Sequence, residues 1–160
     1  TGQVKKKKEI EIKIPEGVET GHQLRISGKG EAGINGGPNG DIYLEIHVAE
    51  SSFYERDAEN LTIELPITIT EAILGCKKEV PTIYGNVIME IKPGCQSGTK
   101  YKLKGKGLKV PGSLRKGDEF VIVKVITPTK ITREQKKLLD ALDETGLDND
   151  SIFKEFKKHL

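Results

Sequence analysis

The chain has few of the residues that build an aromatic core or a covalent framework. Its 160 residues include no tryptophan, four tyrosines, four phenylalanines and two cysteines. The interior must therefore consist mainly of isoleucine, leucine and valine, and we expect it to be arranged in thin layers. The two cysteines, Cys76 and Cys95, form no C-x-x-C pair. We interpret them as free thiols of a cytoplasmic protein.

Long apolar runs and a strong charge excess are also missing. No run approaches the ~20 residues of a membrane span, and no signal-peptide pattern opens the sequence. The net charge is only +2, although 31% of the residues are charged. A protein dedicated to nucleic acid is usually more basic. Lysines gather only locally, in Lys5–Lys8 and Lys100–Lys109, so a nucleic-acid-binding β-barrel using these lysine-rich loops is kept as the alternative.

The sequence contains no recognisable catalytic or metal-binding set. His22, His47 and His159 are scattered, and nothing provides a nucleophile with its base or an H-E-x-x-H pair. The segment Gly28-Lys29-Gly30 could suggest a phosphate loop. A P-loop, however, continues with Ser or Thr and opens a helix, and this segment does neither. We therefore expect no enzymatic activity and no bound cofactor.

The most informative feature that is present is an internal repeat at an offset of 77 residues. Glycines keep their register while the residues between them vary, and apolar positions keep step with them. Gly17, Gly21, Gly28, Gly30 and Gly40 return as Gly94, Gly98, Gly105, Gly107 and Gly117. Glycine is retained where the backbone needs a positive φ or a close approach. The repeat therefore predicts one backbone fold used twice.

Alternation of apolar and polar residues predicts strands in both copies. The first copy should contain the strands Lys7–Ile14, Gln23–Ser27 and Asp41–Val48. The second should contain Leu61–Leu65, which Pro66 would end, and then Lys77–Ile83, Asn86–Ile91, Lys100–Lys104 and Glu119–Ile126. A short helix is expected over Thr70–Gly75, with Thr68 or Thr70 as its N-cap and Gly75 as its C-cap.

The C-terminal segment changes to a helical pattern. Thr132 and Gln135 form a capping box, residues 146–150 break the pattern, and Ser151 begins a second helix. Its apolar residues can pack on their own domain or between two chains, and we favour pairing between chains. The expected dimerisation residues are Leu138, Leu139, Leu142, Ile152, Phe153 and Phe156.

These patterns predict a mainly β fold of two tandem β-sandwich or barrel-like domains. The first domain should occupy residues 1–50 and the second 61–129, with a linker at 51–60 and the helical segment at 130–160. The offset maps Leu61 to position −16, so about 16 residues of the first copy are expected before Thr1. Either the chain is a fragment, or an insertion separates the two parts in a parent protein.

The repeated motifs resemble the C-terminal substrate-binding region of DnaJ-type co-chaperones. In the first copy the match comprises Ile14-Pro15-Glu16-Gly17-Val18, Gly28-Lys29-Gly30-Glu31-Ala32-Gly33 and Gly40-Asp41-Ile42-Tyr43. In the second it includes Val80-Pro81-Thr82, Pro93-Gly94, Gly105-Lys106-Gly107 and Gly117-Asp118, and the segment around Phe53 and Arg56 also fits. The resemblance implies a homodimer that holds unfolded polypeptides, prevents their aggregation and delivers them to a DnaK-type chaperone.

The resemblance also implies where a client and a metal would bind. Client side chains would contact Ile10 and Leu44, with Ile12, Leu24 and Ile46 as neighbours, and the alternative is that these residues only fill a core. Zinc would belong to a cysteine-rich module preceding Thr1, so this chain should hold none. The His-Pro-Asp tripeptide of the J-domain is absent. We therefore do not expect the chain to stimulate ATP hydrolysis through that motif.

Overall fold

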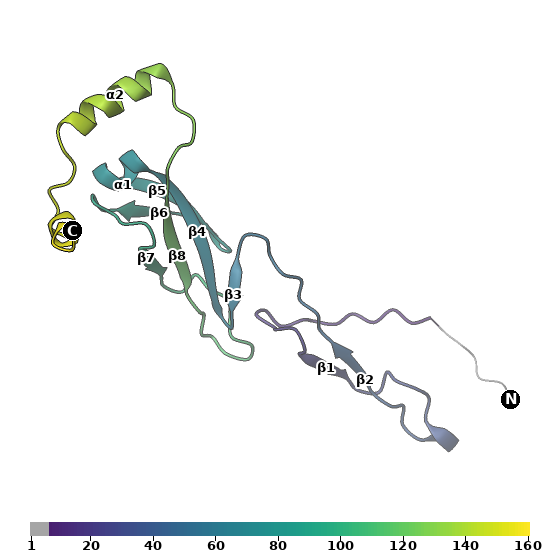
Figure 1. Ribbon diagram of the computed structural model, residues 1–160. Helices are drawn as coiled ribbons and strands as arrows, with labels where there is room; N and C mark the ends of the chain where they lie inside the picture. Colours follow the sequence, from purple (N-terminus) through teal and green to yellow (C-terminus); the bar gives the residue numbers. More distant parts are fainter. Residues whose placement is uncertain (1–6) are drawn as a thin grey trace. The chain divides into compact units, whose positions relative to one another are not determined.

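The computed structural model describes residues 7–160 of a mainly β protein with a few short helices (Figure 1). Two compact units are present: one ends at Val125, and the other runs from Ile126 to Leu160. The mainly β class predicted from the alternation is confirmed. Each unit is described separately below.

The first copy of the repeat forms a two-stranded antiparallel sheet. Strands β1 (Gln23–Ile26) and β2 (Ile42–Glu45) pair with Leu24 opposite Leu44. The glycine-rich segment between them is a loop with one 3-10 turn, Ile34–Gly36. The ladder continues for one step beyond β2, because the Ile46 amide donates to the His22 carbonyl at 2.8 Å.

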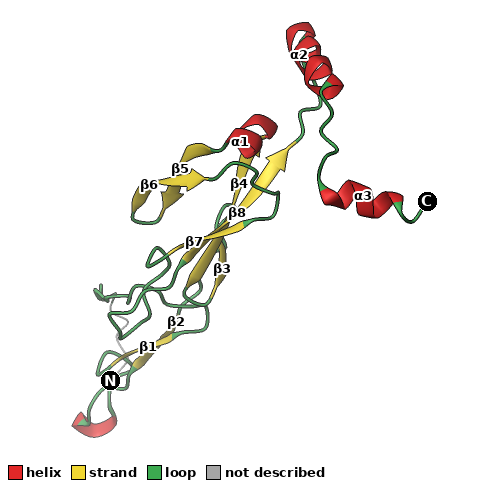
Figure 2. Cartoon of the chain, turned by 90° about the vertical axis from the view of Figure 1, so that its left-hand side faces the viewer, coloured by secondary structure: helices red, strands yellow, loops and turns green. Residues whose placement is uncertain are grey.

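The second copy and the strands before it form a four-stranded sheet and a hairpin (Figure 2). The order in the sheet is β3-β4-β8-β7, and the separate hairpin is β5-β6. The strands are β3 (Glu55–Asp57), β4 (Asn60–Thr68), β5 (Cys76–Thr82), β6 (Gly85–Ile91), β7 (Lys100–Leu103) and β8 (Glu119–Ile126). Helix α1 (Ile69–Leu74) follows β4, and its capping box of Thr68 and Glu71 and its C-cap at Gly75 confirm the predicted helix.

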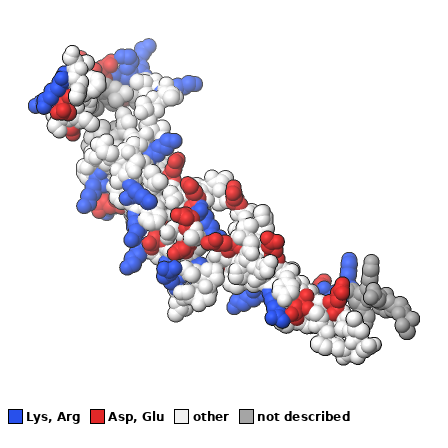
Figure 3. Space-filling model, turned by 60° about the horizontal axis from the view of Figure 1, so that its bottom comes forward, with Lys and Arg blue, Asp and Glu red and all other residues white. Residues whose placement is uncertain are grey.

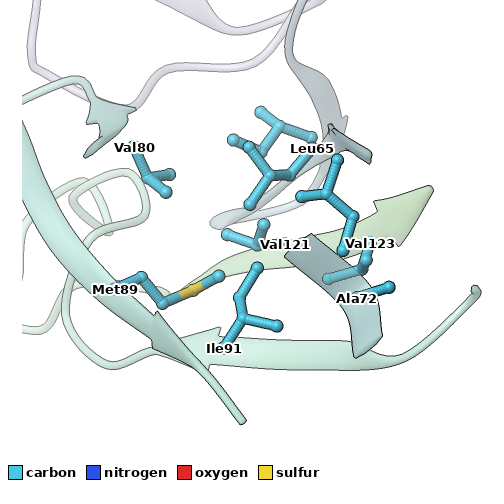
Figure 4. Close-up of a cluster of buried hydrophobic side chains, with 9 residues drawn as sticks. Leu65, Ala72, Val80, Met89, Ile91, Val121 and Val123 are labelled. Carbon is cyan, nitrogen blue, oxygen red and sulfur yellow. The ribbon is translucent and has the colours of Figure 1, made fainter. Parts of the chain in front are cut away.

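The core lies between this sheet, the hairpin and α1 (Figure 4). All nine of its buried side chains are aliphatic or methionine, as the shortage of aromatic residues predicted. They are Ile63, Leu65, Ile67, Ala72, Val80, Met89, Ile91, Val121 and Val123. Cys76 and Cys95 are both free thiols at the edge of this core, which agrees with the sequence interpretation.

The sequence repeat is also a repeat of hydrogen-bonded register. Leu24 lies opposite Leu44 in the first copy, and Tyr101 lies opposite Val121 in the second. All four residue pairs of β1–β2 recur in β7–β8 at the same offset of 77 residues. One backbone arrangement is therefore used twice, as the spacing of the glycines predicted.

Three glycines show why the spacing is fixed. Gly28 and Gly105 have φ angles of 70° and 72°, which glycine adopts without a steric penalty. Their amides donate to the carboxylates of Asp41 and Asp118 at 3.0 and 2.8 Å. At Gly107, a Cβ atom would lie 2.4 Å from the Glu59 carbonyl oxygen. A positive φ and a close approach thus each require glycine here.

The prediction that Pro66 ends its strand is wrong, because β4 continues to Thr68. The Leu61 amide donates to the Asp118 carbonyl of β8 at 2.9 Å. Backbone groups alternate between the two edges of a strand, so Pro66 turns its nitrogen away from β8. The ladder with β3 already ends at the pair Glu55–Thr62. Pro66 therefore removes no hydrogen bond from the sheet.

The strand predicted at Lys7–Ile14 is also not formed. Its counterpart β6 is a strand because it pairs with β5 along its whole length. By the offset, the partner of Lys7–Ile14 would lie just before Lys7, outside the described residues. The expected strand Asp41–Val48 is assigned only over Ile42–Glu45. Conversely, β3 is a strand that the sequence did not indicate.

The unit from Ile126 to Leu160 contains two helices. Helix α2 (Arg133–Glu144) begins at the predicted capping box of Thr132 and Gln135. Helix α3 (Ser151–Lys157) begins where predicted, with Asp150 as its N-cap. No side chain of either helix is buried. The unit therefore has no core of its own.

Candidate binding surfaces

The first candidate surface is the apolar face of β1–β2. Leu24 and Leu44 are a directly opposed pair, and alternation places Ile46 on the same face. All three side chains are half-buried. The structure thus brings together three of the five residues that the sequence analysis connected with a client.

The counterparts of this face in the second copy are covered. Val121 and Val123, at the offset positions of Leu44 and Ile46, are 0% and 1% exposed. The second copy covers them with the β5–β6 hairpin and α1. Among the described residues, no hairpin or helix occupies the corresponding place over β1–β2. Within residues 7–160, this apolar surface is a buried core in the second copy and half-buried in the first, where the offset places the counterparts of α1 and β5 outside the described residues.

The two remaining residues of the predicted client site lie outside this ladder. Ile10 is half-buried and Ile12 is 38% exposed, in a segment without strand structure. Their counterparts Val87 and Met89 face the core from β6. The structure does not place Ile10 and Ile12 in a sheet with Leu44, and their assignment to the site stays a prediction.

A charged cluster stabilises the loop end of β1–β2. Arg25 and Asp41 form an ion pair at 2.6 Å, and the Gly28 amide donates to the same carboxylate. The hydrogen bond from Gly28, followed by that from Arg25, holds the pKa of Asp41 below its ordinary value. Over the face shown in Figure 3, lysines and arginines are interspersed with carboxylates. The ion pair therefore stabilises the loop between β1 and β2. The charges on this face do not form a surface of one sign.

The second candidate surface is the apolar side of helices α2 and α3. The six residues predicted for dimerisation all lie on these helices, and five are exposed: Leu138, Leu142, Ile152, Phe153 and Phe156. Leu138 and Phe156 are 65% and 67% exposed, whereas Leu139 is half-buried. Such a density of exposed large apolar side chains is typical of a surface that contacts another protein.

The sequence analysis missed a contact between the two copies. The guanidinium of Arg56, on β3, donates to the carbonyls of Gly17 and Val18 at 2.7 and 2.9 Å. Gly17 also passes so close to the Lys109 carbonyl that no Cβ would fit. The sequence marked Arg56 and Gly17 only as motif residues. Their role depends on a contact 39 residues apart in the sequence, which no local pattern encodes.

The described residues offer neither a metal site nor a membrane-spanning helix. Residues 7–160 contain no group of three or more histidine, cysteine or acidic side chains that could hold a metal ion. In the same residues, none of the helices combines the length and apolar character that crossing a membrane requires.

The arrangement defines a class: a mainly β binding module of two repeated copies, with one apolar face accessible and a helical C-terminal unit. A family model described as "DnaJ C terminal domain" matches residues 2–128. The chain belongs to this family. The resemblance stated from the motifs is confirmed.

Curated relatives with the same name cover nearly the whole chain. "Chaperone protein DnaJ" of Bacillus cytotoxicus is 45% identical over 158 residues, which is 99% of this chain and 43% of that protein. "Chaperone protein DnaJ" of a Geobacillus strain is 50% identical over 146 residues, which is 91% of this chain and 38% of that protein. The chain thus spans about two fifths of the length of these relatives.

Proposed function

We propose that the chain is the client-binding and dimerisation region of a cytoplasmic DnaJ-type co-chaperone. It binds unfolded or misfolded polypeptides, prevents their aggregation and delivers them to a DnaK-type chaperone, without catalysing a reaction itself. The observation that carries the proposal is the β1–β2 face. Its residues match a buried core at the offset of 77 but are only half-buried among the described residues of the first copy.

A polypeptide would bind this surface by strand addition. β1 and β2 form a sheet of only two strands among the described residues, so within residues 7–160 each strand has one edge without a partner strand. Main-chain hydrogen bonds to such an edge give affinity without regard to sequence, and pockets for alternate side chains select apolar residues. Leu24, Leu44 and Ile46 would form those pockets, and Ile10 and Ile12 would complete them. This chemistry suits a binder of many unrelated unfolded chains.

The helical unit would join two copies of the chain. Its exposed apolar residues need a cover, and a second copy offers an identical surface. Two client surfaces in one dimer raise the affinity for a long client through effective concentration, without any new contact. Zinc, where the parent protein carries it, would belong to a module preceding Thr1.

The nucleic-acid alternative has less support. Lys109 is paired with Glu16 at 2.9 Å, and Lys100 lies 4.3 Å from the ring centre of Phe120. These lysines are thus engaged within the protein, and the net charge is low. A filter-binding titration with RNA at two salt concentrations distinguishes the two functions, because phosphate contacts weaken steeply as salt rises.

The client surface is tested by substituting Leu44. We expect Leu44→Asp to weaken binding of a fluorescein-labelled peptide of alternating leucine and serine by about tenfold or more, since a buried leucine contributes roughly 1.5–3 kcal/mol. Fluorescence anisotropy measures the affinity. Tyr43→Asp is the matched control, because Tyr43 is 63% exposed on the opposite face of β2 and should leave the affinity unchanged.

If Leu44 only fills a core, its substitution weakens binding by unfolding the protein, so the fold of each variant must be checked. Far-UV circular dichroism verifies that each variant retains its sheets, and the milder Leu44→Ala replaces Leu44→Asp if the latter unfolds. A folded Leu44 variant that binds the peptide as tightly as the wild type would contradict the assignment.

A further inference from the structure

A cleft distinct from the β1–β2 face lies in the unit that ends at Val125, beside β3 and β4. Its volume is about 1280 Å³, larger than the roughly 300–1000 Å³ of small-molecule pockets. Phe53 and Tyr54 line it as an edge-to-face pair with ring centres 4.9 Å apart, and Ile83 and Ile122 add aliphatic surface. Phe53 is half-exposed. The size and lining are suitable for an extended polypeptide with large apolar side chains.

The charges in this cleft have one predominant sign. Four glutamates line it: Glu19, Glu50, Glu55 and Glu64. The one lysine or arginine among the lining residues is Arg56, whose guanidinium is engaged by backbone carbonyls and lies 4.0 Å from Glu19. The other three glutamates form no ion pair with a described residue. The cleft is therefore complementary to lysine and arginine side chains.

The cleft also contains an open sheet edge. The ladder between β3 and β4 ends at Glu55 and Thr62, and both residues line the cleft. Because Leu61 points its amide at β8, alternation turns the main-chain N–H and C=O of Glu64 to the opposite edge. No described strand pairs with β4 at that position. An added segment could therefore pair with the main chain of Glu64 one step beyond the end of β3, whereas Pro66 on the same edge offers only its carbonyl.

We propose that this cleft binds an extended polypeptide segment in which lysine or arginine alternates with apolar residues. The segment pairs with the main-chain N–H and C=O of Glu64 on β4, its apolar side chains contact Phe53 and Ile122, and its basic side chains meet Glu55 and Glu64. The inference rests on the proposed function, because the occupant is a segment of the same unfolded client. It adds a second surface, selective for basic clients, to the apolar surface of β1–β2.

The experiment uses the full chain and two labelled peptides, one of alternating lysine and leucine and one of alternating glutamate and leucine. We expect the wild type to bind the lysine peptide at least tenfold more tightly than the glutamate peptide in fluorescence anisotropy, because the leucines of both can reach β1–β2 but only the lysines meet the glutamates of the cleft. Glu64→Lys should weaken the lysine peptide by about tenfold through lost attraction and added repulsion. Glu90→Lys, an exposed glutamate on β6 outside the cleft, is the matched control and should change the affinity less than twofold.

The failure of this inference is separable from that of the proposed function. Leu44→Asp should leave binding of the lysine peptide to the cleft in place, because Leu44 belongs to the β1–β2 face and not to the cleft. Equal binding of both peptides by the wild type, equal effects of Glu64→Lys and Glu90→Lys, or loss of lysine-peptide binding in Leu44→Asp would each overturn the second surface. An uncharged leucine–serine peptide that responds only to Leu44→Asp supports both surfaces.

Discussion

Glu119 has a buried carboxylate without a hydrogen-bond or ion-pair partner among the described residues. It lies on β8 opposite Leu103, it is 0% exposed, and among the described residues neither carboxylate oxygen has a hydrogen-bond partner. The repeat places the apolar Ile42 at the matching position of the first copy. Burial raises the pKa of Glu119 from 4.5 to about 7. The charged form of this residue therefore opposes folding.

We predict that Glu119→Gln makes the protein more stable in mildly alkaline solution. The pKa of Glu119 in the folded state exceeds its unfolded value, so the folded state holds the extra proton between about pH 4.5 and 7. Stability that depends on this proton is full below about pH 4.5 and is lost as the pH rises through about 7. Glutamine has no such charge, and we expect it to raise the free energy of unfolding by about 1–3 kcal/mol at pH 8.

Urea unfolding followed by far-UV circular dichroism at pH 5.0 and pH 8 measures this effect. The difference between Glu119→Gln and the wild type isolates Glu119 from Asp41 and Glu71, whose pKa values are lowered in the fold and which destabilise it only in acid. A difference in stability that is the same at both pH values would contradict the prediction.

Single residues were predictable where a local rule fixes them. Thr132 and the glycines of the repeat follow from capping and backbone geometry, and the structure confirms them. The repeat could have marked Glu119 as an unusual buried charge, since its counterpart Ile42 predicts an apolar residue at position 119. Arg56 could not, because its acceptors are main-chain carbonyls of Gly17 and Val18, and any residue type can supply those.

At the level of elements, the N-cap of α2 should determine how well that helix forms. Thr132 accepts a hydrogen bond from the Gln135 amide, and the Gln135 side chain accepts one from the Thr132 amide. With no buried side chain to hold the helix within its own unit, the cap has an unusually large share in its stability. We predict that Thr132→Ala destabilises α2 by about 1 kcal/mol.

Amide hydrogen exchange in the first turn of α2 measures this local effect. Thr129→Ala is the control, since Thr129 precedes the cap and forms no hydrogen bond among those found for the described side chains. Exchange that is equally fast in both variants would mean that the cap is not what holds the helix.

Elements were predictable from alternation when their partner strand was also encoded nearby. Residues 119–126 form a strand with the predicted bounds. Lys7–Ile14 alternates equally well but forms no strand, because alternation describes a face and hydrogen bonding needs a neighbour. The prediction from Pro66 was wrong for a related reason. Whether a proline ends a strand depends on which strand edge its nitrogen faces, and that edge is known only once β3 and β8 are placed.

On the scale of the whole molecule, the helical unit should control the assembly state. Its exposed leucines and phenylalanines have no cover within the unit. We predict that deleting residues 130–160 halves the mass measured by light scattering. Phe156→Ser in the full chain should weaken the dimer in the same direction, since Phe156 is 67% exposed and a buried phenylalanine contributes roughly 1.5–3 kcal/mol. An unchanged mass in both variants would remove the claim of dimerisation.

The repeat made the two-copy organisation predictable, whereas the joint between the copies was not. The same spacing of glycines gave the paired loops and the matching register of β1–β2 and β7–β8. The spacing could not show whether the apolar face of β1–β2 or that of β7–β8 is the more exposed, because the residues of the two faces have the same apolar character. In residues 7–160, β5, β6 and α1 cover the second copy, and the offset places the counterparts of α1 and β5 in the first copy outside these residues.

The central claim is that the accessible face of β1–β2 is where a client binds. Hydrogen exchange with mass spectrometry, with and without a permanently unfolded client protein, tests it directly. We expect the amides of residues 23–26 and 42–46 to gain protection when the client is present, through added-strand hydrogen bonds. Protection that leaves these two segments unchanged, while the client is bound elsewhere on the chain, would contradict it.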